Sequence, residues 1–586
     1  MTTRPGRRTA IPIDDYRRVQ RASGLLAEAN EADILGPTDV HVAARLSALA
    51  GETDPEVALG LALATRAVRT GSVALDLHQV AEIDTTFPWP TDTDDWLARI
   101  SRSPLVAQRI LVIDNGLLYL ERYHDQEVLV ADELSRRRHR PRPTIAPDRL
   151  DAGLGRLFPA EADADQREAA RLAVAESTII ITGGPGTGKT TTIAKVLALL
   201  AEQYAAADPN HVPRFALAAP TAKAAARLAE AFDEASRRLP EADRDRLPAT
   251  GASTLHRLLG WKPESRSRFR HDRHSRLPHD VVVVDEASMV SLTMMARLLE
   301  ALRPEARLII VGDPDQLSSV EAGAVLADLV AGLGADARRP LVARLRRTYR
   351  FGGQIGLLAQ ALRDGAAEEA LGILQAGGPE VSLFADLAER RGLMVDAALE
   401  LRGHAREGDA AAAVAALGSH RLLCAHRHGP YGVSYWNRQI EQWLSEETGD
   451  AHWAPMYVGR PLLVTSNDPA MDLNNGDTGV VVRRDGRLVA AFDAGTSIRE
   501  VSAARLTDVE TMHAATVHKS QGSQARRVTV LLPDADSQLL TRELLYTAVT
   551  RAQEEVAIIG TPETVRAALG RRIQRASGLR QRLATD

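Results

Sequence analysis

Residues 183–190 have the spacing of a phosphate-binding loop. They read Gly-Gly-Pro-Gly-Thr-Gly-Lys-Thr and follow an apolar run at 178–182. Glycines at this spacing let backbone N–H groups point at phosphate oxygens, and the N-terminal dipole of the helix that follows favours the same anion. Lys189 supplies a positive charge for the phosphates and Thr190 a hydroxyl for Mg²⁺. The order of strand, loop and helix predicts a nucleoside triphosphate site.

A second apolar run, four valines at 281–284, ends in two adjacent acids, Asp285 and Glu286. A carboxylate at the carboxyl end of a parallel strand beside the phosphate loop is placed to hold Mg²⁺. We therefore predict that Asp285 binds the metal and that Glu286 orients or deprotonates the attacking water.

Three further side chains are candidates for contact with the terminal phosphate. Gln316 lies in a loop at 312–317 that follows another apolar run. Arg350 and Arg551 belong to segments at 349–351 and 544–552 in the C-terminal half of the chain. If two α/β domains face each other across the nucleotide, both guanidinium groups reach the γ-phosphate as arginine fingers.

The elements that position these residues follow from the apolar pattern. Residues 1–140 are rich in Ala, Leu and Val at helical spacing and predict an all-helical N-terminal docking domain. Strand-like runs alternate with helical segments over 145–340 and again over 341–586, which predicts two α/β domains with parallel sheets. Within the second, short alternating strands and turn signals at 475–477 and 485–487 predict a small β-barrel inserted at about 435–510.

Composition narrows the class further. The 586 residues include one cysteine, Cys424, which excludes an internal disulfide framework. No long uncharged apolar run is present and the N-terminus lacks an apolar core, so we expect a cytoplasmic protein. The net charge of −5 argues against general attraction to nucleic acid, so local basic stretches matter more. These stretches lie at 136–142, which we interpret as a linker, at 266–276 and at 566–582. The second has Trp261 and Phe269 nearby, as in surfaces that bind a DNA backbone and stack on bases.

An ordered series of other motifs accompanies the nucleotide site. They occupy 219–225, 254–260, 348–352, 422–425, 429–433, 474–479, 516–523 and 541–546. With them the chain resembles the superfamily one helicases and, within these, the RecD family, the alpha subunits of the exodeoxyribonuclease V (RecBCD) helicase–nuclease. The resemblance spans 150–580. One departure is Gln524, where many relatives carry Glu.

The resemblance implies two RecA-like P-loop domains and an ATP-driven motor that translocates 5′ to 3′ in double-strand break repair and recombination. Its ligands would be ATP, Mg²⁺, single-stranded DNA and duplex ends, and its partners RecB-like and RecC-like subunits docked on the N-terminal domain. Carried over to this sequence, contacts with nucleotide fall on Gln166, which would read the adenine edge, and on Gly183, Gly184, Pro185, Gly186, Thr187, Gly188, Lys189, Thr190, Thr191 and Gly522. Contacts with DNA fall on Pro220, Thr221, Lys223, His256, Thr516 and His518. We find no nuclease constellation in the sequence.

Two other functions remain open at this point. The chain is a RecD-like helicase that works without partners, or it is a DNA-dependent ATPase that regulates a complex without separating strands itself.

Overall fold

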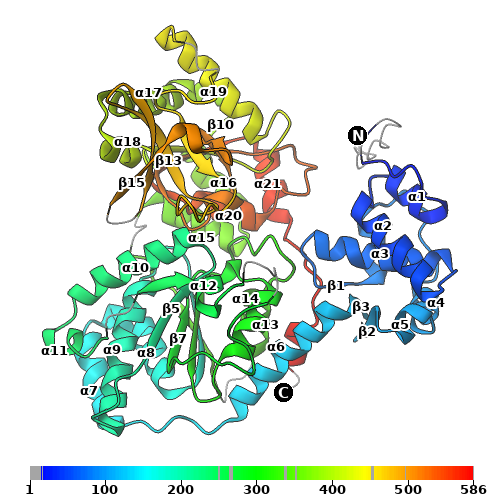
Figure 1. The fold of residues 1–586 in the computed structure, drawn as a ribbon, viewed down its shortest axis with the longest axis horizontal. Coiled ribbons are helices and arrows are strands. Elements are labelled where there is room, and N and C mark those ends of the chain that lie inside the picture. Colours follow the sequence, from blue (N-terminus) through cyan, green and yellow to red (C-terminus); the bar gives the residue numbers. More distant parts are fainter. Residues whose placement is uncertain are drawn as a thin grey trace.

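The computed structural model describes residues 15, 17–248, 251–262, 268–334, 339–349, 353–450, 454–494 and 497–584. In Figure 1 a first parallel sheet with its helices lies below a second one, and a smaller antiparallel sheet lies on the upper domain. The N-terminal helical region stands to the right of both. The long helix α6 (Glu121–His139) runs from this region along the lower domain.

The first sheet has six parallel strands in the order β6-β5-β7-β8-β4-β9. Their bounds are β4 Thr178–Gly183, β5 Phe215–Ala219, β6 Ala252–Thr254, β7 Val281–Val284, β8 Arg307–Gly312 and β9 Val342–Leu345. Successive side chains of a strand point to opposite faces, and both faces here are buried. Ile179 and Ile181 accordingly pack into one core and Ile180 into the other.

Helices cover both faces of this sheet. Their bounds are α7 Pro147–Leu157, α8 Ala164–Ala175, α9 Lys189–Ala207, α10 Ala222–Arg237, α11 Glu241–Arg244, α12 Leu255–Leu259, α13 Leu292–Ala301 and α14 Val325–Leu333. Helices α7 to α10 share the core that contains Ile179, whereas α12, α13 and α14 pack with α6 against the opposite face. The apolar runs therefore formed buried parallel strands, as the sequence predicted.

The boundary that we predicted at residue 341 needs a correction. Strand β9 lies beyond it and pairs with β4, so the first sheet extends to Leu345. Ala343 and Leu345 are buried in the core of the first sheet, which explains why this short strand joins the first domain.

The second sheet has five parallel strands in the order β10-β19-β18-β11-β17. These are β10 Val381–Phe384, β11 His420–Cys424, β17 Ala514–Thr516, β18 Ala525–Leu531 and β19 Ala552–Ile559. The helices of this half are α15 Gln354–Asp364, α16 Ala367–Ala376, α17 Arg391–Glu407, α18 Ala410–Ala416, α19 Val433–Thr448, α20 Arg542–Val549 and α21 Pro562–Gly570. Helices α15, α16, α20 and α21 pack on one face, and α17 and α19 pack on the other.

The smaller sheet is antiparallel, in the order β15-β14-β13-β12-β16. Its strands are β12 Pro461–Val464, β13 Thr478–Arg484, β14 Arg487–Asp493, β15 Ile498–Ser502 and β16 Val509–Thr511. The β13–β14 hairpin turns at Asp485 and Gly486, both with positive φ, as the Asp-Gly signal requires. The insertion starts later than predicted, because residues 435–448 lie in helix α19.

The N-terminal region is mainly helical and has its own core around the fully buried Trp96. Its helices are α1 Gly24–Glu31, α2 Pro37–Ala50, α3 Pro55–Arg69, α4 Thr93–Ser101 and α5 Pro104–Ala107, followed by α6. Our prediction of an all-helical domain was wrong, because a three-stranded antiparallel sheet of β1 Ala74–Leu75, β2 Leu111–Asp114 and β3 Leu117–Leu120 lies within it. The turn between β2 and β3 is Asn115-Gly116 with both φ angles positive, which is a strong hairpin signal.

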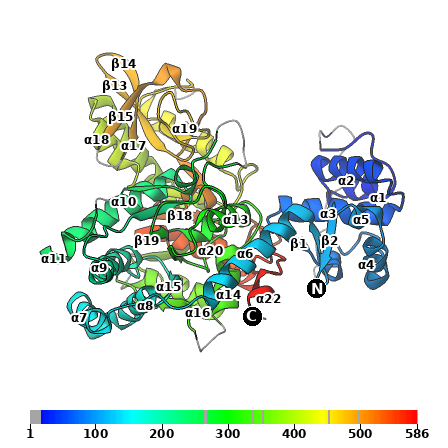
Figure 2. The ribbon, with the colours of Figure 1, turned by 60° about the horizontal axis from the view of Figure 1, so that its bottom comes forward.

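The C-terminal segment returns from the second sheet to the first, as Figure 2 shows for α22 (Leu579–Ala584) beside α14 and α6. Ala576 accepts hydrogen bonds from the N–H groups of Val73 and Ala74, and Arg575 donates to the carbonyls of Glu321 and Gly323. Part of the basic stretch at 566–582 is therefore packed into the fold. Arg137, in the stretch that we interpreted as a linker, is 1% exposed and donates to the carbonyls of Arg303 and Ala306.

Within the described ranges, no helix combines the length and the apolar character that crossing a bilayer requires.

Candidate functional site at the junction of the two parallel sheets

The phosphate-binding loop lies between β4 and α9, at the carboxyl end of the first sheet. Gly186 and Gly188 both have φ of 78°, in the left-handed region where a side chain would be strained. The ammonium of Lys189 donates to the carbonyls of Gly183 at 2.7 Å and Gly184 at 2.9 Å. Thr187 is buried, whereas Thr191 is exposed in the first turn of α9. The loop thus presents a lysine and the N-terminal N–H groups of a helix to one place.

The acid pair follows the neighbouring strand β7. Asp285 is 9% exposed, and its Oδ1 accepts from the N–H of Glu286 at 2.8 Å. Glu286 has φ of 51°, an uncommon value for a side chain of this kind. Burial and the neighbouring Glu286 raise the pKa of Asp285 to about 6, and the Lys189 ammonium opposes this rise. A buried carboxylate of this kind is stabilised in its charged form by a cation.

Asp285 and Thr190 present the oxygen donors that Mg²⁺ prefers. Among the described residues, Oδ2 of Asp285 and the hydroxyl of Thr190 have no hydrogen-bond partner. These two oxygens therefore suit a hard divalent cation.

A hydrogen-bonded network joins the two sheets beside the loop. Gln316 donates to Oδ2 of Asp313 at 3.0 Å, and its Oε1 accepts from Nη2 of Arg551 at 3.0 Å. The hydroxyl of Tyr546, on α20, donates to the same Asp313 oxygen at 2.9 Å. Thr547 accepts from the N–H of Leu317 at 2.8 Å. Because all six residues are buried, these contacts fix the loop after β8 against α20 and against Arg551, which follows that helix.

Tyr546 also lies against the phosphate-binding loop. A methyl group on Gly184 would lie 2.9 Å from the Tyr546 hydroxyl and 3.8 Å from Nη1 of Arg363. The loop therefore contacts the second domain directly. We did not select Tyr546, Asp313 or Arg363 from the sequence. Tyr546 and Asp313 stand in segments that we quoted, but a tyrosine and a loop aspartate carry no spacing that reveals their mutual contact.

Gln166 and Gly522, two of the predicted nucleotide contacts, lie in different surroundings. The Gln166 amide donates to the carbonyl of Thr187 at 3.2 Å, so it lies on the phosphate-binding loop. Gly522 has φ of 68° and faces Ala224 of α10, where a methyl group would lie 3.6 Å from the alanine Cβ.

Arg350 lies outside the described residues. Its neighbour Tyr349 donates from its N–H to the carbonyl of Gly186 at 2.8 Å, which brings that segment to the loop.

The predicted DNA contacts cluster at the ends of strands. Pro220 and Thr221 follow β5, and the Thr221 hydroxyl accepts from the N–H of Ala224 at the start of α10. His256 is exposed in α12, directly after β6. Thr516 ends β17 and accepts from the N–H of Lys519, with His518 between them. These residues lie at or just after the carboxyl ends of β5 and β6 in the first parallel sheet and β17 in the second, and their contact with DNA stays a prediction.

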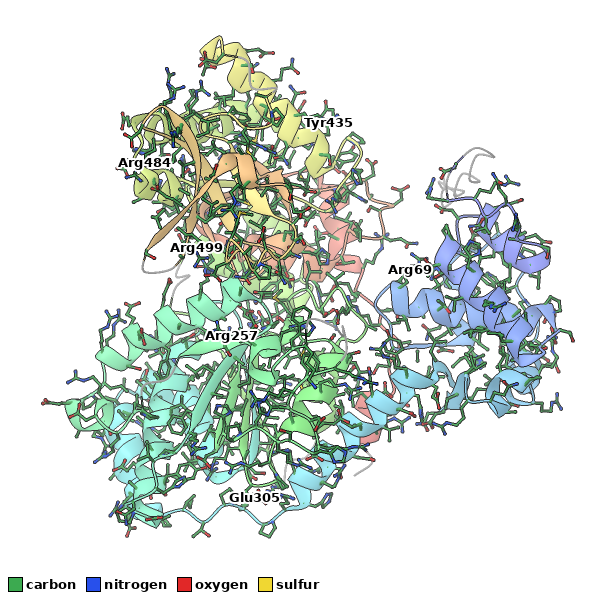
Figure 3. All side chains as sticks on the ribbon, viewed as in Figure 1. Arg69, Arg257, Glu305, Tyr435, Arg484 and Arg499 are labelled. Atoms are coloured by element: carbon green, nitrogen blue, oxygen red, sulfur yellow. The ribbon has the colours of Figure 1, made fainter. Side chains whose placement is uncertain are left out.

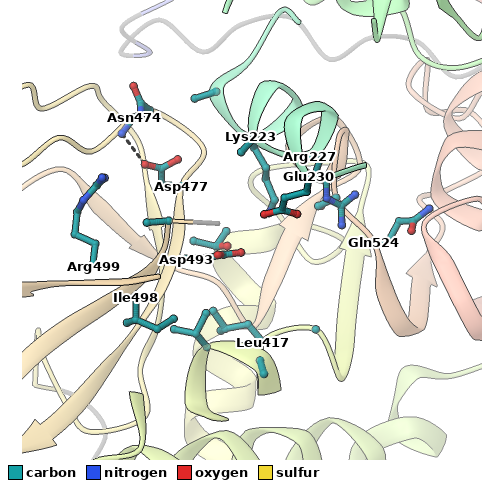
Figure 4. A pocket seen from close by; sticks show the side chains of 18 of the residues that line it. Lys223, Arg227, Glu230, Leu417, Asn474, Asp477, Asp493, Ile498, Arg499 and Gln524 are labelled. Carbon is teal, nitrogen blue, oxygen red and sulfur yellow. Dashed lines mark hydrogen bonds between the residues drawn. The ribbon is translucent and has the colours of Figure 1, made fainter. Parts of the chain in front are cut away.

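Lys223 lies apart from them in a pocket of about 590 Å³ between α10 and the small sheet. Figure 4 shows Lys223 on α10 on the side of Asp477 and Asp493, whereas Arg227 lies toward Gln524. Burial, with the nearby Arg421 and Arg227, lowers the pKa of Lys223 to about 7, and the two aspartates oppose the shift. A cation held in this environment is stabilised by any additional anion.

A phosphate-binding loop, an acid pair and an arginine brought in from a second parallel sheet define a P-loop ATPase of the helicase class. Sequence comparisons agree. Residues 166–322 match a family described as an AAA domain, 511–559 match a UvrD-like helicase C-terminal domain, and 31–119 match the N-terminal domain of the RecBCD enzyme subunit RecD.

Curated relatives identify the family. The RecBCD enzyme subunit RecD of Mycolicibacterium smegmatis is 55% identical and covers 94% of this chain and 98% of its own. That of Mycobacterium tuberculosis is 53% identical, over 98% of this chain and 99% of its own. The ATP-dependent RecD2 DNA helicase of Deinococcus radiodurans is 32% identical over 65% of this chain and 47% of its own. The chain belongs to the RecD family and is an ATP-dependent DNA helicase subunit.

Proposed function

We propose that the chain is the 5′ to 3′ motor of a RecBCD-type helicase–nuclease that acts in double-strand break repair and recombination. The observation that carries this proposal is the buried bridge from Asp313 and Gln316 on the first domain to Tyr546 and Arg551 on the second. A bridge of this kind lets an event at the γ-phosphate change the relative position of two domains.

ATP binds where the phosphate-binding loop faces α20. Lys189 and the loop N–H groups hold the phosphates, and Glu286 orients the attacking water. Thr190 and Asp285 would hold Mg²⁺, which neutralises developing charge on the phosphates. Arg551 stabilises charge on the γ-phosphate in the transition state, together with Gln316 and Arg350. Gln166, at the edge of the loop, contacts the adenine.

Movement follows from the coupling of this site to the DNA surface. Thr221 and His256 lie on the first domain, and Thr516 and His518 lie on the second. Closure on ATP and opening after hydrolysis change the spacing between these two groups and advance the strand. Contacts with the backbone give affinity without reading sequence.

The remaining parts have supporting roles in this proposal. The N-terminal helical region, with a core of its own, docks on RecB-like and RecC-like subunits in the cytoplasm. We also propose that the insertion is a small β-barrel beside the DNA path, and the five antiparallel strands from Pro461 to Thr511 support this. We assign DNA cutting to a partner subunit.

Unwinding of duplexes that carry a 5′ or a 3′ single-stranded tail tests this function, with the chain alone and with its co-purified partners. We expect ATP-dependent separation from the 5′ tail only, and none with Lys189→Ala. Full activity of the monomeric chain would favour a helicase that works without partners. DNA-stimulated hydrolysis without unwinding in either preparation would instead indicate a regulatory ATPase, and unwinding from the 3′ tail would contradict the direction.

A further inference from the structure

A cleft made of two cavities lies between the N-terminal helical region and the motor, and Arg69, which Figure 3 labels, lines both cavities. Its lower part is a cavity of about 350 Å³ between the ends of α3 and α6 and the residues around α12 and α13. Its upper part, of about 730 Å³, continues toward the second parallel sheet. Arg69 lines both parts, so the two cavities adjoin along one wall.

The N-terminal wall of the lower cavity carries two arginines. Arg122 is exposed at the start of α6, and none of the described residues offers it a carboxylate partner. Arg69 is held by the buried Asp39, which accepts from Nε and Nη2 of the guanidinium. This pairing fixes the group and leaves Nη1 without a hydrogen bond to the described residues, while the side chain stays 47% exposed. A fixed guanidinium with an available N–H is a good phosphate ligand.

The same cavity has aromatic walls. His256 is exposed on the motor side, where its ring packs against the buried Phe269 with a centroid distance of 5.9 Å, and Tyr123 lines the N-terminal side. Such rings provide stacking surfaces for nucleobases, which bind without regard to sequence. His256 is also one of the residues predicted to contact the translocated strand. The lower cavity therefore adjoins the predicted DNA surface at this residue.

Charge separates the two parts of the cleft. Glu321 is the acid that lines the lower cavity beside Arg69 and Arg122. The upper cavity has Asp33 beside Arg17 on its N-terminal wall, and Asp534 and Asp536 on the wall of the second domain. The excess of positive charge in the lower cavity therefore favours binding of a polyanion, whereas the positive and negative charges of the upper cavity offset each other.

We propose that single-stranded DNA leaving His256 enters the lower cavity, where Arg69 and Arg122 bind its phosphates and the aromatic walls accept its bases. The N-terminal region is then a second wall of the DNA path as well as a docking region. This inference rests on the proposed function, because it extends the strand that the motor holds.

The first test measures binding of a fluorescent oligo(dT) to the full chain over a range of salt concentrations. Arg122→Ala should weaken binding severalfold at low salt and reduce the slope of log K against log salt by about 0.7, the value for one phosphate contact on a single strand. Arg102→Ala is the control, because Arg102 is an exposed arginine that follows α4 in the same region and lines neither cavity. Equal slopes for Arg122→Ala and the unaltered chain would overturn the proposal.

The second test uses the rarity of cysteine. Cys424 is fully buried and burial raises the pKa of its thiol to about 12, so it reacts slowly with maleimide. A thiol from Val320→Cys lies in the lower cavity, and one from Val212→Cys serves as a control, since the two valines are 73% and 72% exposed. Saturating oligo(dT) should slow modification of the first at least fivefold and leave the second unchanged.

The double variant Arg122→Glu with Val320→Cys distinguishes DNA held in the lower cavity from DNA held by the surface of the motor alone. At equal saturation with DNA, the charge reversal should abolish protection of the thiol. Unchanged protection, or no protection in the single variant, would overturn the inference while DNA-stimulated ATP hydrolysis persists. If DNA does not stimulate ATP hydrolysis by the unaltered chain, the proposed function itself is wrong.

Discussion

Arg551 donates from Nη2 to Oε1 of Gln316 at 3.0 Å, although the two residues belong to different α/β domains and are 235 positions apart. Each side chain is 5% exposed. The Arg551 Nε also donates to the carbonyl of Thr547 at 3.0 Å, which fixes the plane of the guanidinium. A buried arginine held in this way is oriented before nucleotide binds, so little side-chain entropy is lost when the γ-phosphate arrives.

Replacing Lys189 by Ala should reduce DNA-stimulated ATP hydrolysis by about 100-fold or more, because it removes a charge that stabilises the transition state. The fold should survive, since the hydrogen bonds of the ammonium to the described residues go to two loop carbonyls, those of Gly183 and Gly184. Steady-state hydrolysis and a circular dichroism melt check the two statements. The control is Lys195→Ala on the same helix, where the ammonium lies 4.4 Å from the Phe158 ring centroid. Near-normal turnover in Lys189→Ala would mean that the nucleotide site is misassigned.

Glu127 should be a stability residue of the C-terminal connection. It is fully buried and accepts hydrogen bonds from Tyr119, Ser577, Gly578 and Arg582. Glu127→Ala leaves these donors unpaired and should cost about 3 kcal/mol. Denaturant unfolding measures this loss, and hydrogen exchange should rise first at residues 577–584.

The matched control for Glu127 is Glu121→Ala at the start of the same helix. Glu121 is 42% exposed and pairs with Arg109 on the surface, a type of contact worth about 1 kcal/mol or less. Equal losses of unfolding free energy for the two variants would show that the buried hydrogen bonds of Glu127 stabilise the fold no more than a surface ion pair does.

Asp328 should make stability depend on pH. Burial raises its pKa to about 7, with Glu127 adding to the shift and Ser577 and Arg580 opposing it. The folded state holds a proton that the unfolded state releases near pH 4, so stability falls as pH rises from about 4 to 7 and is then constant. Asp328→Asn removes this loss, with an upper limit of about 4 kcal/mol for a shift of this size. Its gain in thermal stability over the unaltered chain should be larger at pH 8 than at pH 5, and an equal difference at both would contradict this pKa.

The sequence predicted the strongest periodic elements correctly. The valines at 281–284 and the isoleucines at 179–181 formed the central strands β7 and β4, because long apolar runs next to loop signals have few alternative structures. The short strands β1 and β9 escaped prediction, since two to four residues carry little periodicity and their pairing is set by distant segments.

The candidate site also contains residues that the sequence revealed and contacts that it did not. Lys189 and Asp285 stand in motifs whose local chemistry is visible in the sequence. The contact of Tyr546 with Gly184 depends on how two domains meet, which no local pattern encodes.

The measurement that tests the account most directly compares nucleotide affinity with turnover in Arg551→Ala. We predict that a fluorescent non-hydrolysable ATP analogue binds within a few-fold of the unaltered chain, while DNA-stimulated hydrolysis at saturating ATP falls about 1,000-fold. Arg551→Lys, which keeps the charge and loses the planar fork, should recover only part of this rate. Loss of nucleotide binding together with unchanged turnover at saturation would contradict the claim that hydrolysis requires an arginine brought from the second sheet.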